Sequence, residues 1–297
     1  MPDAHRPSQK NVRMKHLIAL LIALHAGLGG GIARADNIIW LNSEFPPMAM
    51  SQGPHANQGY INVLATYLAG RLPQHQFGEQ VVPWQRAMHM AEKGGPYCLL
   101  AAFQTPERET YLRFSKPYGY VFPLGLVTRR AQREAFTKYL NADGKIQLGR
   151  LLQDPNLRPG IANQRSYGSL IDNLLKRANH SQAAPISQIY QSESTSGLFS
   201  MLDYQRIDYT FSYPGELVYF SSRHQDLQFY LIEGNDRLLP GRLSCTRSPQ
   251  TDRAFTDLSE ALKSNHHQEL LRNSYERWLP EYLIEPYHRM LEELPRE

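Results

Sequence analysis

The chain has 297 residues, of which 41% are hydrophobic and 20% charged, so it is long enough for a large core and for one or two domains. Its formal net charge of +4 equals the net charge of the first 35 residues, where five Lys and Arg face Asp3 alone, so the remainder sums to about zero. This excludes a broadly basic surface of the kind that binds nucleic acid or an anionic membrane.

The N-terminal segment predicts export. Lys10, Arg13 and Lys15 precede an apolar run at 17–24, a glycine-rich bend and Ala33-Arg34-Ala35, which is the order of a secretory signal peptide. The run is shorter than the roughly 20 residues that cross a bilayer, and no second long apolar run follows. We expect a signal peptide at 1–35, cleaved after Ala35, and a periplasmic protein that begins at Asp36.

Two cysteines, Cys98 and Cys245, lie in the exported part. An oxidising compartment favours one disulfide between these distant segments, and two separate buried thiols are the alternative. Neither cysteine has a C-x-x-C partner or a histidine at ligand spacing, so we expect no metal site.

The first half of the exported chain alternates short apolar runs with helical periodicity. Runs at 38–41, 81–82 and 97–103 predict strands, and the segments 61–72 and 84–93 predict helices that end at Pro73 and at Gly94-Gly95. This alternation predicts an α/β domain with a mostly parallel sheet.

The alternation restarts after an extended run at 121–128. Strands are predicted at 160–162, 186–190 and 207–211, with helices at 169–177 and 195–204 between them, which indicates a second α/β unit. Late strands at 229–232 and 243–246 and a helix capped by Thr251 or Asp252 follow. The tail predicts a further amphipathic helix, whose apolar stripe of Leu270, Leu271, Tyr275, Trp278 and Leu279 should pack into the core.

Two neighbouring motifs carry a family resemblance. Thr105-Pro106-Glu107-Arg108, followed by Phe114-Ser115-Lys116-Pro117-Tyr118, resembles the T-x-E-R and F-S-x-P-Y signature of family 3 extracellular solute-binding proteins. Other segments agree in order over residues 36 to 280, namely Pro46-Pro47, Gly59, Trp84-Gln85-Arg86, Gly160-Ile161-Ala162 before Arg165-Ser166, and Arg206-Ile207-Asp208.

The resemblance implies a type II periplasmic-binding-protein fold. It has two α/β lobes, each a mostly parallel sheet flanked by helices, joined by two crossing strands near 121–128 and 231–243. Lobe 1 would comprise 36–124 plus 241–297, and lobe 2 would comprise 125–240. Both cysteines then fall in lobe 1, which strengthens the disulfide prediction. We expect a monomer without a cofactor that binds a small molecule in the cleft and meets a membrane permease or receptor.

On lobe 1 the resemblance singles out Arg108. A guanidinium holds a carboxylate through two parallel hydrogen bonds, and the family uses the arginine of this motif in that way, with a hydroxyl near it that Thr105 would supply. The alternative for Arg108 is a surface salt bridge with Glu107 or Glu109.

Further ligand-binding residues are expected on loops and at a helix start. Arg86 begins a helix beside Trp84, where a helix N-terminus and a cation together favour an anion, although a solvated helix residue is an equal alternative. Glu44, Phe45 and Tyr60 lie on loops that the family turns toward the cleft, where aromatic walls and one acceptor would shape the site.

On lobe 2, Arg165, Ser166 and Tyr167 lie between a strand and a helix, which aims backbone amides and a hydroxyl at an anion. Amino-acid-binding members carry an aspartate where this chain has Tyr213, and Glu216 is the nearest carboxylate. The expected ligand is therefore a carboxylate, an aromatic acid or another polar solute, and a standard α-amino acid is in doubt.

No catalytic residue is predicted, because the sequence has no H-E-x-x-H, no G-x-S-x-G and no Gly-rich phosphate loop. The enzyme alternative is a periplasmic dehydratase of the cyclohexadienyl type, with Glu44 or Glu216 as general acid. A sensor for a membrane receptor is the third reading. His266, His267 and Glu269 are interpreted as a solvated helix face and not as metal ligands.

Overall fold

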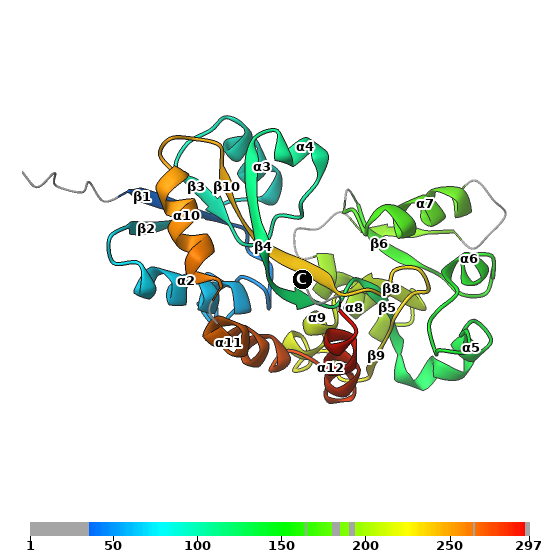
Figure 1. Cartoon of the computed structure of the whole chain (residues 1–297). Coiled ribbons are helices and arrows are strands. Elements are labelled where there is room, and N and C mark those ends of the chain that lie inside the picture. Colours follow the sequence, from blue (N-terminus) through cyan, green and yellow to red (C-terminus); the bar gives the residue numbers. More distant parts are fainter. Residues whose placement is uncertain (1–35, 164, 180–184, 190–193, 264, 295–297) are drawn as a thin grey trace, which may run out of the picture. The chain divides into compact units, whose positions relative to one another are not determined.

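The computed structural model describes residues 36–294 except 164, 180–184, 190–193 and 264 (Figure 1). The predicted signal peptide at 1–35 and its cleavage site lie outside these residues. Each element is given below with its observed bounds.

The first sheet has five strands in the order β2 (Gln76–Val81), β1 (Asn37–Asn42), β3 (Tyr97–Leu99), β10 (Leu239–Thr246) and β4 (Leu112–Val121). Strand β1 pairs in parallel with β2 and β3, whereas β10 runs antiparallel to β3 and β4. Successive side chains of β1 enter different cores, with Ile38 and Trp40 in one and Leu41 in the other, as the two-residue period of a strand requires. The sheet is therefore buried on both faces.

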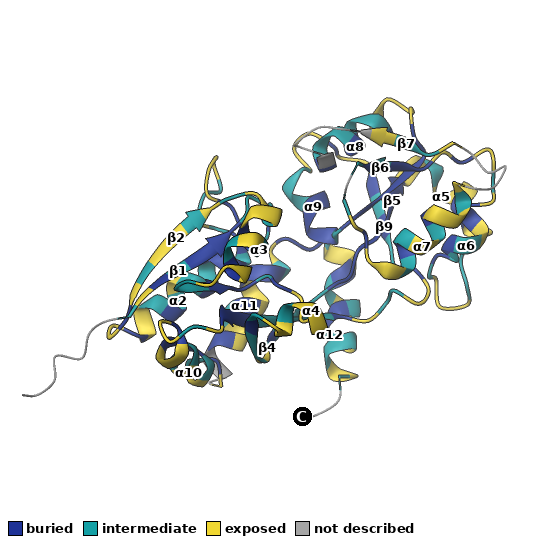
Figure 2. Ribbon diagram, turned by 90° about the horizontal axis from the view of Figure 1, so that it is seen from above, coloured by how far each residue is buried: buried dark blue, intermediate teal, exposed yellow. Residues whose placement is uncertain are grey.

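Helices supply the other half of those cores. Helices α2 (Tyr60–Arg71) and α10 (Asp252–Ala261) pack on the face of Ile38, and α3 (Trp84–Glu92) packs on the face of Leu41 through its small residues Ala87 and Ala91. The short helix α4 (Pro106–Glu109) precedes β4, and α11 (Asn265–Glu276) lies against α2 and β4. Figure 2 shows strand β1 dark blue, with exposed residues on the outer faces of α3 and α10.

The second group of strands contains β8 (Tyr209–Ser212), β5 (Gly125–Arg129) and β9 (Leu227–Tyr230), with β5 antiparallel to both neighbours. Strands β6 (Gly160–Ala162) and β7 (Ser187–Ile189) form a parallel pair, and a parallel bridge between Pro159 and Tyr209 connects it to β8. The remaining helices are α5 (Arg133–Thr137), α6 (Leu148–Leu151), α7 (Ser169–Ala178), α8 (Ser194–Asp203), α9 (Pro214–Tyr219) and α12 (Ile284–Glu292), with 3₁₀ turns at Arg130–Gln132 and Glu281–Leu283.

The two-lobed α/β architecture is confirmed, but the expectation of mostly parallel sheets needs correction. Parallel pairing is found in β1 to β3 and in β6 and β7, whereas β10 and β5 bring antiparallel pairs into both sheets. The chain passes between the sheets twice, at 122–124 and 231–238. After the segment 231–238 the chain re-enters the first sheet as β10, which runs antiparallel to its neighbours β3 and β4.

The elements predicted with the wrong bounds are exposed or irregular. Strand β2 covers Gln76–Val81 and not 81–82, because it is a half-exposed edge strand rich in polar residues. Strand β4 was not predicted, because Pro117 interrupts its pattern. Pro117 lies opposite Arg242 at a register shift, a position where an edge strand tolerates proline.

Thr251 is the N-cap residue of α10, but its hydroxyl donates to the carbonyls of Thr246 and Ser248 and makes no cap bond.

The C-terminal helices contact both segments that connect the sheets. Tyr275 Oη accepts a hydrogen bond from Phe122 N at 2.9 Å, and Tyr287 Oη donates to Tyr120 O at 2.7 Å. Tyr275 and Tyr287 also share a core with Leu238 of the second segment. The predicted lobe boundaries stay a prediction, and the stripe of the tail is confirmed as core packing through Leu271, Tyr275, Trp278 and Leu279.

The disulfide between Cys98 and Cys245 is confirmed. The two residues are directly opposite each other in the antiparallel pair of β3 and β10, and both are fully buried. The bond therefore joins segments 147 residues apart in the sequence within the first sheet.

Candidate ligand-binding site

A buried carboxylate organises one group of the predicted site residues. Glu216 is the third residue of α9, which begins at Pro214 after the N-cap Tyr213. Its Oε2 accepts from Ser212 Oγ at 2.7 Å and from Tyr213 N at 2.9 Å, and its Oε1 accepts from Thr195 Oγ1 at 2.5 Å. The side chain is 3% exposed, so its two oxygens accept hydrogen bonds from protein groups and not from bulk water.

Arg165 is the cation of the same group. Its Nη1 donates to Thr195 Oγ1 at 2.8 Å and its Nη2 to Glu216 Oε2 at 3.4 Å. The rings of Phe45 and Tyr167 lie 5.5 and 5.4 Å from its Cζ, within the range of cation–π attraction. Burial alone would lower the pKa of Arg165, but the Glu216 carboxylate together with the phenols of Tyr167 and Tyr213 outweighs this effect, and the net shift is upward. Arg165 therefore stays charged, with a side chain that is 15% exposed.

We call this group the Arg165–Glu216 cluster and define it by Phe45, Arg165, Tyr167, Thr195, Ser212, Tyr213 and Glu216. Phe45 follows β1 of the first sheet, whereas the other members lie beside β6, β8 and their helices. The Phe45 ring meets the Tyr213 ring edge to face at 6.1 Å. Burial raises the pKa of Tyr213 to about 12, so its phenol is protonated at neutral pH and can donate.

The loop that carries Phe45 makes further contacts with α9. A Cβ added at Gly215 would lie 3.0 Å from Pro47 Cγ, so glycine permits the close approach of these segments. His55 on the same loop packs edge to face on Tyr219 and Trp278 at 6.2 and 5.4 Å. The loop that follows β1 therefore packs against α9.

Arg108 and Thr105 form a separate group with Trp84. Thr105 is the N-cap of α4, and its Oγ1 accepts from Arg108 N at 3.2 Å. The guanidinium of Arg108 donates to Phe103 O at 2.9 Å and lies 5.7 Å from the Trp84 ring centroid. Thr105 thus fixes the backbone of Arg108, whereas Phe103 and Trp84 contact its guanidinium, and Arg108 is half-buried.

The remaining predicted residues have other partners. Glu44 Oε2 accepts from Ser51 N at 2.9 Å and from Ser51 Oγ at 2.5 Å, and Ser166 Oγ donates to Asp172 Oδ2 at 2.6 Å. Tyr60 packs on Tyr275 at 5.2 Å, and burial raises its pKa. Arg86 is exposed on α3.

Sequence reasoning missed two members of the cluster, Thr195 and Ser212. Ser212 ends β8 directly before Tyr213, and Thr195 lies in the first turn of α8. A hydroxyl residue at the end of a strand or the start of a helix was the available signal, and it is too common to single out a site.

The helical histidines require a correction. His267 is fully buried, so it does not belong to a solvated face. The side chain of His266 lies outside the described residues. Within the described part of the chain, no group of three or more His, Cys, Asp or Glu side chains is arranged to hold a metal ion.

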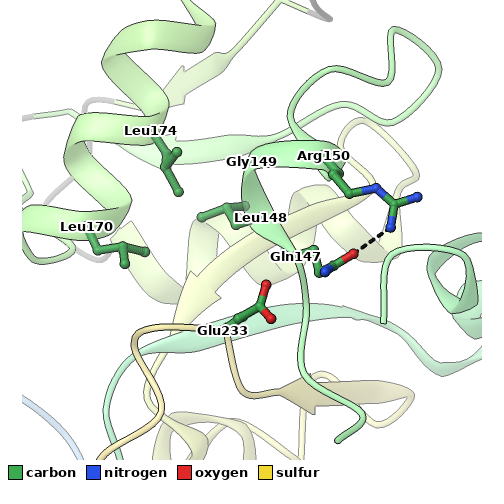
Figure 3. A pocket seen from close by; sticks show the side chains of 7 residues that line it. All are labelled: Gln147, Leu148, Gly149, Arg150, Leu170, Leu174 and Glu233. Carbon is green, nitrogen blue, oxygen red and sulfur yellow. Dashed lines mark hydrogen bonds between the residues drawn. The ribbon is translucent and has the colours of Figure 1, made fainter. Parts of the chain in front are cut away.

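A pocket of about 310 Å³ lies away from all of these residues (Figure 3). Its lining comes from Gln147, Leu148, Gly149, Arg150, Leu170, Leu174 and Glu233. Arg150 is hydrogen-bonded to Gln147 beside it. None of the predicted ligand-binding residues reaches this pocket.

Residues 38–281 match the model of the bacterial extracellular solute-binding proteins, family 3. The chain belongs to this family. A comparison with curated protein sequences finds no match.

Solved structures of solute-binding proteins share the fold. The probable amino-acid ABC transporter extracellular-binding protein ytmK from Bacillus subtilis is 17% identical with a TM-score of 0.61, covering 84% of this chain and 99% of its own. The second substrate-binding domain of GlnP from Lactococcus lactis is 14% identical with a TM-score of 0.54, covering 83% and 96%. An ancestral amino-acid-binding protein described as a precursor of cyclohexadienyl dehydratase is 16% identical with a TM-score of 0.56, covering 82% and 96%. At such identities the likeness shows the fold alone.

Members of this family are extracellular solute-binding proteins. In the described part of the chain, every helix is too short or too polar to span a membrane.

Proposed function

We propose that the protein is a periplasmic solute-binding protein that captures a small polar or anionic solute between two lobes. The observation that carries the proposal is the Arg165–Glu216 cluster, in which Phe45 from one half of the chain meets Arg165 and Tyr213 from the other half. Ligands of two-lobed proteins bind where segments of both lobes converge, and a cleft lined by aromatic rings with a few fixed polar groups suits a small organic solute. The lobes would be 36–124 plus 241–297 and 125–240.

The proposed ligand contacts divide between the two sides of the cleft. On the first side, Arg108 would hold an anionic group, with Thr105 and Trp84 fixing its position and with Arg86, Glu44 and Tyr60 near the rim. On the second side, the N–H donors of Arg165 that Thr195 and Glu216 do not use and the phenol of Tyr213 would donate hydrogen bonds, with Ser166 and Glu216 supporting the loop and the helix start. A planar guanidinium on the first side would give the ligand a fixed orientation.

The structural relatives suggest the partner. They include binding proteins of amino-acid ABC transporters, which supports uptake through a membrane permease. Recognition by a membrane receptor would use the same ligand-driven closure, so the protein would act in sensing if its partner is a receptor. The active form would be a monomer, delivered to the periplasm by cleavage after Ala35.

The dehydratase alternative is supported only by the ancestral relative. It needs a carboxylic acid that donates a proton to the substrate. Glu216 instead accepts from Thr195, Ser212, Tyr213 and Arg165, and Glu44 accepts twice from Ser51. Both carboxylates are engaged as acceptors, which favours binding over catalysis.

A thermal-stability screen tests the proposal. A ligand that binds only the folded state raises the melting temperature by mass action. The panel would contain amino acids, organic acids, aromatic acids, sugars and peptides, each with the purified protein. A reproducible, concentration-dependent rise for one ligand class supports a solute-binding protein, whereas no rise across the panel contradicts it.

A further inference from the structure

We infer that the solute is an organic acid without an ammonium group and that Arg165 selects it. The inference rests on the proposed function and narrows the ligand class. It comes from the hydrogen-bonding capacity that the Arg165–Glu216 cluster has left for a ligand.

The acceptor capacity of the cluster is used internally. An ionised carboxylate has two oxygens with about four lone-pair sites, and Glu216 receives hydrogen bonds from Thr195, Ser212, Tyr213 and Arg165. Three of these hydrogen bonds end on Oε2 and one on Oε1, and only 3% of the side chain is exposed, so burial keeps a ligand cation from the remaining lone pair of Oε1.

The nearby carboxylates in the described part of the chain are also occupied. Asp172 accepts from Ser166 Oγ at 2.6 Å and from Tyr167 N at 2.8 Å. Glu44 is tied to Ser51 on its own loop. An ammonium group that enters a closed site without an open carboxylate loses its hydration and gains no opposite charge in return. An α-amino acid is therefore a poor fit to this wall of the site.

The donor capacity of the cluster remains open. Arg165 has five N–H donors and uses its two terminal nitrogens toward Thr195 and Glu216. The rings of Phe45 and Tyr167 lie 5.5 and 5.4 Å from its Cζ, and 15% of the side chain stays exposed. The protonated phenol of Tyr213 adds a donor. These donors suit a ligand that carries an oxo, hydroxyl or carboxylate oxygen where an amino acid would carry its ammonium group.

The test compares matched ligands that differ only at this group. Isothermal titration with phenylalanine, phenylpyruvate and 3-phenyllactate, and then with glutamate, 2-oxoglutarate and glutarate, measures each affinity under one condition. We expect the amine-free members of at least one set to bind at least about tenfold more tightly than the amino acid. Tighter binding of the amino acid in the responding set would overturn the inference and leave the proposed function standing. The absence of binding by every member of both sets would overturn the inference, and the wider panel above then decides the proposed function.

Variants test the assignment to Arg165. Arg165→Gln should weaken binding of the amine-free acid at least about tenfold, since a charge-assisted donor is lost. The matched control, Arg177→Gln on the exposed face of α7, should bind as the unchanged protein does. An unchanged affinity in Arg165→Gln would remove Arg165 from the site. If circular dichroism shows that Arg165→Gln is unfolded, Arg165→Lys keeps the charge and should retain the preference for amine-free acids with a weaker affinity, and a preference shifted to the amino acid would contradict the inference.

Discussion

Arg108 is the arginine of the family motif, and its surroundings suit a ligand contact. It lies half-buried between the Trp84 ring and the carbonyl of Phe103, so its removal deletes few contacts inside the core. We predict that Arg108→Ala lowers ligand affinity by about 2–5 kcal/mol, the cost of removing one partner of a desolvated charge pair. Titration calorimetry with a ligand found in the screen measures this, and an unaltered affinity would exclude Arg108 from the site.

A second prediction concerns the pair of His75 and Asp257 at the edge of the first sheet. Its side chain is fully buried, with Nε2 2.8 Å from Asp257 Oδ2 and Nδ1 3.3 Å from Asp36 Oδ2. The hydrogen bond from His75 lowers the pKa of Asp257 below its usual value. A lowered carboxyl pKa stabilises the folded state above the unfolded pKa of about 3.9, and this contribution is lost as the pH falls through the folded value.

We therefore expect the free energy of unfolding to fall below about pH 4. Part of this fall should be absent in Asp257→Asn, which would be less stable than the unchanged protein at pH 7 and closer to it at pH 3. Urea denaturation of both proteins across this range measures the difference. A difference that is the same at both pH values would contradict the role of Asp257.

At the residue scale, sequence reasoning singled out three residues that the structure brings together. Arg165, Tyr213 and Glu216 were singled out by a strand-to-helix placement and by a departure from the family pattern, and they lie in one contact network with Phe45. Thr195 and Ser212 could not be found, because a hydroxyl acquires its role only when folding brings a carboxylate from α9 within reach. The hydrogen bonds that Glu216 accepts from these protein groups could not be predicted from the sequence either.

At the element scale, the C-terminal helices support the first segment that connects the sheets. Tyr275 Oη accepts from the buried Phe122 N, and an unsatisfied buried N–H costs about 1–3 kcal/mol. We predict that Tyr275→Phe lowers the free energy of unfolding by this amount in urea denaturation. Tyr282→Phe is a matched control, because Tyr282 accepts from Phe229 N but is 41% exposed, so water can replace its hydroxyl. Equal losses in the two variants would contradict this account.

The disulfide gives the second prediction at this scale. In the chain-entropy model, closing a loop of this length stabilises the folded state by about 5 kcal/mol. Reducing agent should lower the melting temperature of the unchanged protein and leave a Cys98→Ser/Cys245→Ser double variant unaffected. Thiol titration of the unreduced, denatured protein should find no free cysteine, and two free thiols would contradict the bond.

Elements with a strong apolar period were predicted well, and elements shaped by their neighbours were not. Strand β1 and helices α2, α3 and α7 lie within a few residues of their predicted bounds, because their buried faces repeat in the sequence. Strand β4 pairs with β10 across a register shift despite Pro117, and the tail contains α12 as a further helix. The positions of β4 and α12 depend on long-range pairing and packing, which a local sequence pattern does not predict.

At the scale of the whole molecule, a pair of short motifs predicted the fold better than the alternation of elements did. The alternation of elements and the resemblance both suggested mostly parallel sheets, whereas both sheets contain antiparallel pairs. The family resemblance carried the correct two-lobed architecture, because it implies a chain that leaves the first sheet and later returns to it. Strand β10 in the first sheet, between β3 and β4, is that return.

Binding of a small acid by a protein that does not transform it is the central claim, and isothermal titration calorimetry tests it most directly. We predict a saturable, reversible isotherm with one site per chain and a negative heat-capacity change from burial of apolar surface. The ligand should be recovered unchanged after prolonged incubation with the protein. The absence of saturable binding, or heat that continues after saturation together with conversion of the ligand, would contradict the claim.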